Sequence, residues 1–171
     1  MRKLFLSLLL VLPLCGFAQK GMQGVGVNLG IGSLLRGGNL KSPSISYQKH
    51  LGNKVRVSSS VGWLYGNGNL SFDGYYGIEG TFLSQCFITT GINYFFNQPH
   101  RLRPYAIGGL VLGFGEGHYD FDDVTFGVEL GLGVVYRLNY DIAVQCELPF
   151  IIPISWAPNF TIPALSIVYT F

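Results

Sequence analysis

The chain has 171 residues, of which 49% are hydrophobic and only 12% charged, and 24 of them are glycine. High hydrophobicity with few charges excludes an intrinsically disordered protein. The formal net charge is +2, from 11 Lys and Arg against 9 Asp and Glu, so the chain lacks the basic patch with which proteins bind nucleic-acid phosphates. We therefore expect no nucleic-acid partner.

The first segment, residues 1–18, has the pattern of a secretory signal peptide. Two basic residues open it, an apolar stretch follows, and the small residues Gly16 and Ala18 form a cleavage site. The apolar stretch is shorter than the roughly 20 residues that a membrane-spanning helix needs. We predict cleavage between Ala18 and Gln19, which leaves residues 19–171 as one mature domain.

From residue 24 onward, apolar residues recur at every second position in eight runs. This alternation predicts β-strands with one apolar face and one face of small or polar side chains. No run of about 18 apolar residues occurs that would form a transmembrane helix. The runs cover residues 24–31, 44–51, 55–65, 85–96, 105–111, 125–137, 142–148 and 164–171. In the fifth run we expect Tyr105, Ile107 and Val111 on the same face as the apolar residues of the other runs.

The connections between the runs alternate in length. Three short connections of turn-forming residues lie at 52–53, 97–102 and 139–140. Four longer connections lie at about 32–42, 66–74, 115–124 and 151–159. Short periplasmic turns and long outer loops are typical of barrels that are inserted into a membrane from one side.

The chemistry of the two strand faces indicates which face is inside. One face consists mainly of Gly, Ala, Ser and Thr with few charges, which is unlike a water-exposed surface and suits the narrow lumen of an eight-stranded barrel. The apolar face would then contact lipid. The sequence predicts an all-β fold, an eight-stranded antiparallel up-and-down transmembrane β-barrel with four extracellular loops. Aromatic residues near the strand ends, among them Tyr94, Tyr105, Tyr136, Trp63 and Phe126, would mark the two membrane interfaces.

The last strand, residues 165–171, ends with Tyr169 and a C-terminal Phe171. This ending, together with segments 103–109 and 126–136, resembles the small outer-membrane β-barrel proteins of Gram-negative bacteria. The resemblance implies secretion through the inner membrane, a location in the outer membrane, and contact with its lipid and lipopolysaccharide. It also implies insertion by the barrel-assembly machinery, with Tyr169 and Phe171 as the assembly signal. It implies no particular activity, because such barrels have many functions.

Four charged residues fall on the face assigned to the lumen: Arg56, Glu129, Arg137 and Glu147. A charge inside a narrow barrel must be paired or hydrated. We predict a polar cluster of ion pairs that closes the lumen. The alternative is a gated or narrow ion path.

The sequence gives only weak signals of metal binding and of catalysis. His118 lies near Asp120 and Asp122 and could join them in binding a metal, but the spacing matches no known calcium loop, so we expect an acidic outer loop. His50 and His100 fall at short turns, and no Ser–His pair lies on adjacent outward positions. We expect no metal, no cofactor and no catalytic residues.

The three cysteines also have alternative interpretations. Cys15 could be the acylated residue of a lipoprotein, but Leu14 stands where a small residue is usual. Cys86 and Cys146 fall on the fourth and seventh strands, which are not neighbours, so no disulfide is expected between them.

The sequence thus favours an integral outer-membrane β-barrel protein with a structural or interaction role, not an enzyme. One alternative is a small transport or binding barrel for a hydrophobic or ionic ligand, and another is a lipid-modifying outer-membrane enzyme. No external ligand or partner is indicated.

Overall fold

The computed structural model describes residues 21–34, 39–72, 75–97, 101–117, 124–154 and 160–171. The predicted signal peptide and the cleavage site at Ala18 and Gln19 lie outside these residues. Within the described residues, no helix is long and apolar enough to cross a membrane.

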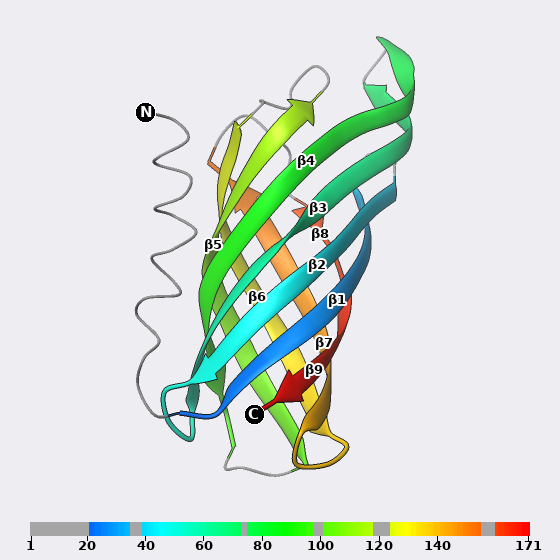
Figure 1. The fold of residues 1–171 in the computed structure, drawn as a ribbon. Helices are drawn as coiled ribbons and strands as arrows, with labels where there is room; N and C mark the ends of the chain where they lie inside the picture. The colour runs from blue at the N-terminus through cyan, green and yellow to red at the C-terminus, as the bar shows by residue number, and fades with distance from the viewer. Residues whose placement is uncertain (1–20, 35–38, 73–74, 98–100, 118–123, 155–159) are drawn as a thin grey trace.

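The described residues form one closed antiparallel sheet (Figure 1). From β1 to β8 each strand pairs with the next one in the chain, and β8 and β9 both pair with β1, so the sheet has no free edge. The strands are β1 (Gln23–Leu34), β2 (Asn39–His50), β3 (Val55–Phe72), β4 (Tyr75–Phe95), β5 (Leu102–Gly117), β6 (Val124–Arg137), β7 (Ile142–Pro153), β8 (Phe160–Thr161) and β9 (Ala164–Thr170).

The two elements β8 and β9 together make the eighth strand of the barrel. Both pair with β7 on one side and with β1 on the other. Ile162 and Pro163 separate them, and a proline has no backbone N–H to donate to a neighbouring strand. The predicted eight-stranded up-and-down transmembrane barrel is confirmed.

The strands extend further into the predicted long connections than the sequence indicates. β3 and β4 stay paired from Val55 opposite Tyr94 to Phe72 opposite Tyr75, so most of the predicted loop 66–74 is strand. Likewise β1 and β2 remain paired as far as Ser33 and Asn39. The glycines and asparagines of these segments suggest loops, but pairing between two long strands overrides such local preferences.

At the other end, which we call the short-turn end, the β2–β3 and β6–β7 turns are tight as predicted, and part of the third predicted turn, 97–102, lies outside the described residues. Leu51 donates its backbone N–H to the carbonyl of Val55 across the β2–β3 turn (3.0 Å). In the β6–β7 turn, the side-chain oxygen of Asn139 accepts the backbone N–H groups of Asp141 and Ile142. Phe171 lies at the same end, paired by backbone hydrogen bonds with Gln23.

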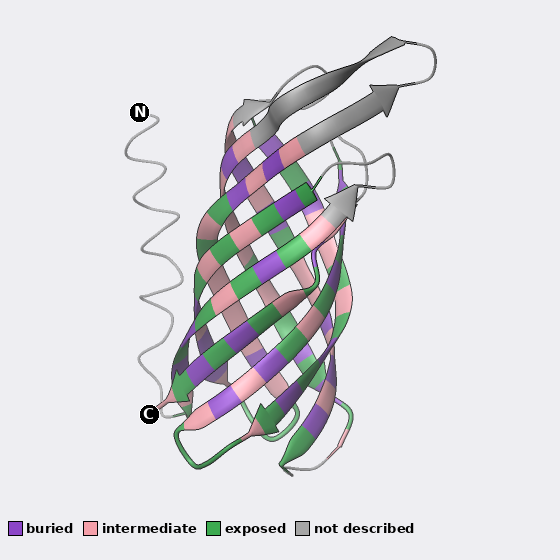
Figure 2. Cartoon of the chain, turned by 90° about the vertical axis from the view of Figure 1, so that its right-hand side faces the viewer, coloured by how far each residue is buried: buried purple, intermediate pink, exposed green. Residues whose placement is uncertain are grey.

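The outer surface of the barrel is apolar. Burial alternates along each strand, and the outward positions are exposed (Figure 2). Val27, Leu132 and Ile167 are each about 60% exposed. A continuous apolar belt of this kind requires lipid around it. The aromatic residues Tyr94, Tyr136, Tyr169 and Phe171 are exposed on this surface near the short-turn end.

One strand has the opposite orientation from that predicted. Tyr105, Ile107 and Val111 of β5 are buried inside the barrel, and Tyr105 is completely inaccessible. Leu110 lies on the outside instead. Gly133, directly opposite Tyr105 on β6, makes this possible, because a Cβ there would lie 2.5 Å from the tyrosine ring. Tyr105 is therefore part of the interior and not of an interfacial girdle.

Candidate functional site

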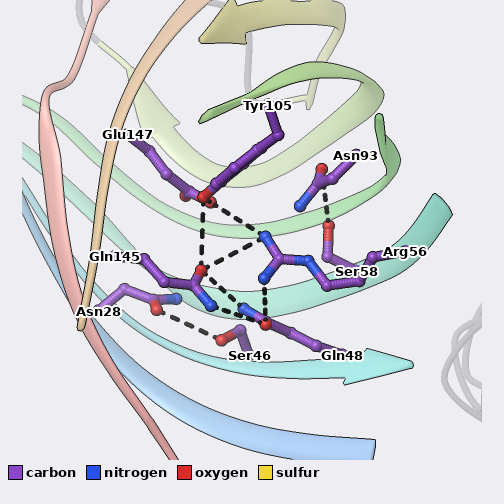
Figure 3. Close-up of polar contacts among 9 residues, drawn as sticks. All are labelled: Asn28, Ser46, Gln48, Arg56, Ser58, Asn93, Tyr105, Gln145 and Glu147. Atoms are coloured by element: carbon purple, nitrogen blue, oxygen red, sulfur yellow. Dashed lines mark hydrogen bonds and ion pairs between the residues drawn. The ribbon is translucent and has the colours of Figure 1, made fainter. Parts of the chain in front are cut away.

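A network of polar side chains crosses the lumen above the short-turn end, and Arg56 lies at its centre (Figure 3). Its neighbours Val55 and Val57 face outward, so strand alternation turns Arg56 inward, where only 1% of it is exposed. Its Nη1 donates to Oε1 of Gln48 (2.8 Å), and its Nη2 donates to Oε1 of Gln145 (3.4 Å). These contacts satisfy a guanidinium that would be very costly to bury alone.

Two glutamines connect opposite walls of the barrel. Gln48 lies on β2 and Gln145 on β7, two strands that are not neighbours in the sheet. Each side-chain amide donates to the oxygen of the other, at 3.1 and 2.9 Å. Both side chains are buried, so the bridge lies inside the lumen.

A carboxylate balances the charge of Arg56. Glu147 Oε1 lies 3.8 Å from Arg56 Nη2 and accepts a hydrogen bond of 2.5 Å from the hydroxyl of Tyr105. The ring of Tyr105 also lies 4.8 Å from the guanidinium carbon, in a cation–π contact. Asn93, with its amide oxygen turned toward Arg56, accepts from Nη2 and Nε at 2.5 and 3.1 Å.

We call this group of buried side chains the polar layer. Its members come from five strands, β2, β3, β4, β5 and β7. They are Gln48, Arg56, Asn93, Tyr105, Gln145 and Glu147.

A small cavity of about 90 Å³ lies on the loop side of the polar layer. Serine and threonine hydroxyls line it, together with Glu129 and Glu147. Such a volume holds a few water molecules and is well below the roughly 300–1,000 Å³ of ordinary ligand pockets. The two carboxylates therefore line a space that is large enough for water.

A second set of side chains, which we call the apolar layer, fills the lumen toward the loop end. All are less than one-tenth exposed, and most also line the cavity. They are Leu40, Leu64, Phe87, Val111, Ile151 and Ile162. Buried side chains thus lie on both sides of the cavity.

The four predicted luminal charges do not form one cluster. The structure brings Arg56 and Glu147 together, and Glu129 shares the cavity with Glu147. Arg137 lies apart at the short-turn end, where it contacts the sulfur of Met22 (3.5 Å). Arg103 is buried at the same end of the barrel, and Lys49 is buried as well.

No protein-family model matches the chain, and no curated protein matches it. Among solved structures, Neisserial surface protein A superposes with a TM-score of 0.62 and 15% identity, over 88% of this chain and 96% of that one. The N-terminal β-barrel domain of Pseudomonas aeruginosa OprF gives a TM-score of 0.57 and 16% identity, over 89% and 100%. The fold is that of the small outer-membrane β-barrels.

The same fold has also been obtained by design. A de novo transmembrane β-barrel superposes with a TM-score of 0.59 and 16% identity, over 90% of this chain and 98% of the design. Likeness at this level of identity therefore establishes the architecture of the barrel and no activity.

Sequence analysis missed several residues of the polar layer. The sequence predicts Tyr105 on the lipid face, although Arg103, at the start of the same strand, shares its face and an arginine is unfavourable on a lipid-facing surface. That charge was the available signal. Gln48, Asn93 and Gln145 lie at inward positions of their strands by alternation, but alternation alone does not show which inward residues meet across a lumen.

The other sequence candidates are placed as follows. His50 stacks on Phe95, with ring centroids 5.7 Å apart, and the structure pairs it with no nucleophile among the described residues. His100, His118 and the nearby aspartates lie outside the described residues. Cys86 and Cys146 are both free thiols.

The predicted assembly residues Tyr169 and Phe171 lie at the closing strand. Tyr169 is paired with Val25 of β1 and Ile142 of β7. Its ring centroid lies 6.4 Å from that of Phe171, and both side chains face outward.

Proposed function

We propose that this chain is an integral outer-membrane protein whose barrel is closed and whose function lies in its outer loops and surfaces. The observation that carries the proposal is the bridge between Gln48 and Gln145, held by Arg56, which joins opposite walls of the lumen. The apolar layer adds a second obstruction. A barrel filled in this way acts as an anchor or an interaction module and not as an open pore.

The alternative is a narrow ion path, favoured by one observation. Glu129 and Glu147 line a hydrated cavity within the lumen. For conduction, an ion would have to pass both the polar layer and the apolar layer, and eight strands leave little room for it. We therefore propose the closed form, without catalytic activity, as the main function.

Conductance in planar lipid bilayers tests the closed lumen. We expect the purified barrel to insert without stable conductance steps. Regular steps that persist in independent preparations would overturn the closed form and favour the transport alternative. Empty detergent and the same protein heat-denatured before addition are the controls, since both report leakage of the bilayer itself.

The route to the membrane belongs to the same proposal. We propose that a signal peptide is removed between Ala18 and Gln19 and that the barrel-assembly machinery recognises the last strand through Tyr169 and Phe171. Intact-mass measurement of the membrane protein is expected to give a chain that begins at Gln19, whereas a diacylglyceryl mass on Cys15 contradicts this.

Deletion of Phe171 tests the assembly signal. We expect the deleted protein to be secreted but to lose heat-modifiable migration on gels, because an unclosed strand leaves unpaired backbone groups in lipid. Unchanged migration would count against the signal. Replacement of Phe171 by Tyr keeps an aromatic terminus and serves as the control.

A further inference from the structure

A second cavity opens at the short-turn end of the barrel, on the other side of the polar layer. Its volume is about 370 Å³, four times that of the cavity between the layers. Arg103, Arg137 and His50 line it, together with Asn53 and its neighbours in the β2–β3 turn. The ring of Phe95 separates it from the polar layer, since this ring contacts the guanidinium of Arg103 (4.0 Å) as well as that of Arg56 (5.2 Å).

Among the described residues, the two arginines of this cavity have no anionic partner. In the part of the chain that the structure describes, neither guanidinium has a carboxylate within ion-pair distance, because the one ion pair there joins Arg56 to Glu147. Glu129 and Glu147 lie on the far side of the polar layer. Arg137 and Arg56 both repel the charge of Arg103 electrostatically.

Arg103 is also fixed by its contacts, and its guanidinium retains an N–H donor that these contacts do not use. It is 2% exposed, stacks on Phe95 and donates from Nη2 to the backbone carbonyl of Asn53. Its Nε is buried and has no hydrogen-bond partner among the residues that the structure describes. A guanidinium has five N–H donors, and a buried donor without a partner is energetically unfavourable. Arg137 has a weak partner, the sulfur of Met22.

We infer that this cavity binds an oxyanion, a phosphate or carboxylate group, between Arg103 and Arg137. The planar fork of a guanidinium matches both groups in a bidentate geometry. Stacking on Phe95 fixes Arg103 before binding, so little conformational entropy is lost. The volume accommodates a small anion or the anionic end of a larger molecule.

The source of the oxyanion depends on the proposed function, but the site itself does not. If the short turns face the periplasm, the cavity opens toward free periplasmic anions and toward the headgroups of the inner leaflet. Both sources present the same chemistry, so the experiment must separate a soluble phosphate from a lipid phosphate.

The test is a titration of the full barrel in nanodiscs of phosphatidylcholine, followed by the Nε–H NMR signals of its arginines. We expect added pyrophosphate to give saturable shifts at Arg103 and Arg137. The exposed Arg101 at the same end does not line the cavity and should not shift. A parallel sample uses nanodiscs that contain phosphatidylglycerol, without added pyrophosphate. Shifts at Arg103 and Arg137 in that sample would identify a lipid headgroup as the source of the oxyanion.

Variants distinguish a built site from general attraction of charges. Arg137→Gln should weaken pyrophosphate binding about tenfold or more, because an interaction with a charged group is lost. Arg101→Gln removes the same charge outside the cavity and should change the affinity less than about twofold, as an exposed charge contributes little. Arg137 lies at the barrel mouth, so this variant is expected to fold even if Arg103→Gln does not.

Three outcomes would overturn the inference. They are the absence of saturable shifts in every sample, an equal loss of affinity in Arg101→Gln and Arg137→Gln, and shifts at all arginines alike. None of these results bears on the closed lumen, because conductance is measured separately and depends on the two layers above the cavity.

Discussion

The two ends of the barrel interior carry different kinds of buried side chain. The polar layer joins walls of the barrel through hydrogen bonds and one ion pair, with Arg56 as the shared partner. The apolar layer, nearer the loops, consists of buried side chains such as Leu64 and Phe87. The first depends on matched partners, so the loss of one member leaves others unsatisfied. The second depends on volume, so the loss of one member leaves a space.

The largest effect is expected where the polar layer loses its cation. Arg56→Ala should lower the free energy of unfolding by about 3–5 kcal/mol, because Glu147 then loses its counter-ion and each of the two glutamine oxygens loses one of its donors. Urea unfolding in lipid vesicles, followed by tryptophan fluorescence, measures the change. Arg101→Ala, an exposed arginine, is the control, and an equally small loss in both variants would show that the polar layer contributes little.

In the apolar layer, Leu64→Ala should cost about 2–3 kcal/mol, the low end of the range for buried leucines, because the neighbouring cavity already admits water. The same unfolding experiment applies. Leu132→Ala removes an equal volume from the outer surface, where lipid replaces the lost side chain, so it should cost clearly less. Equal losses would mean that the apolar layer is not packed.

Gly133 of β6, which lies opposite Tyr105, provides a steric test of the polar layer. Gly133→Ala should cost about 1–3 kcal/mol, because the new methyl group overlaps the tyrosine ring. Gly108→Ala on β5 is a matched control, since nothing lies within 4 Å of a Cβ there. A double-mutant cycle with Tyr105→Ala should remove most of the penalty at Gly133. An additive cycle would contradict the proposed contact.

The smallest effect concerns the hydroxyls beside the cavity. Ser60 and Thr89 hydrogen-bond inside the lumen (2.7 Å), and the neighbouring pair Ser59 and Thr90 does so on the lipid side (3.1 Å). Ser60→Ala should cost about 0.5–1 kcal/mol, since cavity water can replace the lost partner. Ser59→Ala should cost more, because lipid offers no replacement. The reverse order would indicate a dry cavity.

Alternation allowed most of the fold to be predicted from sequence, and it also explains where prediction failed. Seven of the eight runs were assigned to the correct face, because their inward residues are small or polar, as at Gly24, Gly26 and Asn28 of β1. On β5 both faces carry apolar or small residues, so hydrophobicity did not distinguish them. The deciding information was Gly133, which lies 28 positions from Tyr105 in the chain and directly opposite it in the sheet.

The candidate site was predictable only in part, for a similar reason. Arg56 and Glu147 were assigned to the lumen by their own strands, and the structure brings them together. The apolar layer was not foreseen, because Ile151 was placed in a loop and Ile162 between predicted elements. Contacts across a lumen depend on the stagger of strands around the whole barrel, and no local pattern contains that information.

The interruption at Ile162 and Pro163 bears on how the barrel closes. Strand β1 must find partners about 140 residues away in the chain, so this seam is expected to form last during folding. The break divides the seam into a longer part, from Gly24 opposite Thr170 to Gly30 opposite Ala164, and a two-residue part beyond it. We expect the pairing of β1 with β9 to form first, starting from the C-terminal end. When the barrel is unfolded by force, we expect the two-residue pairing of β1 with β8 to break first.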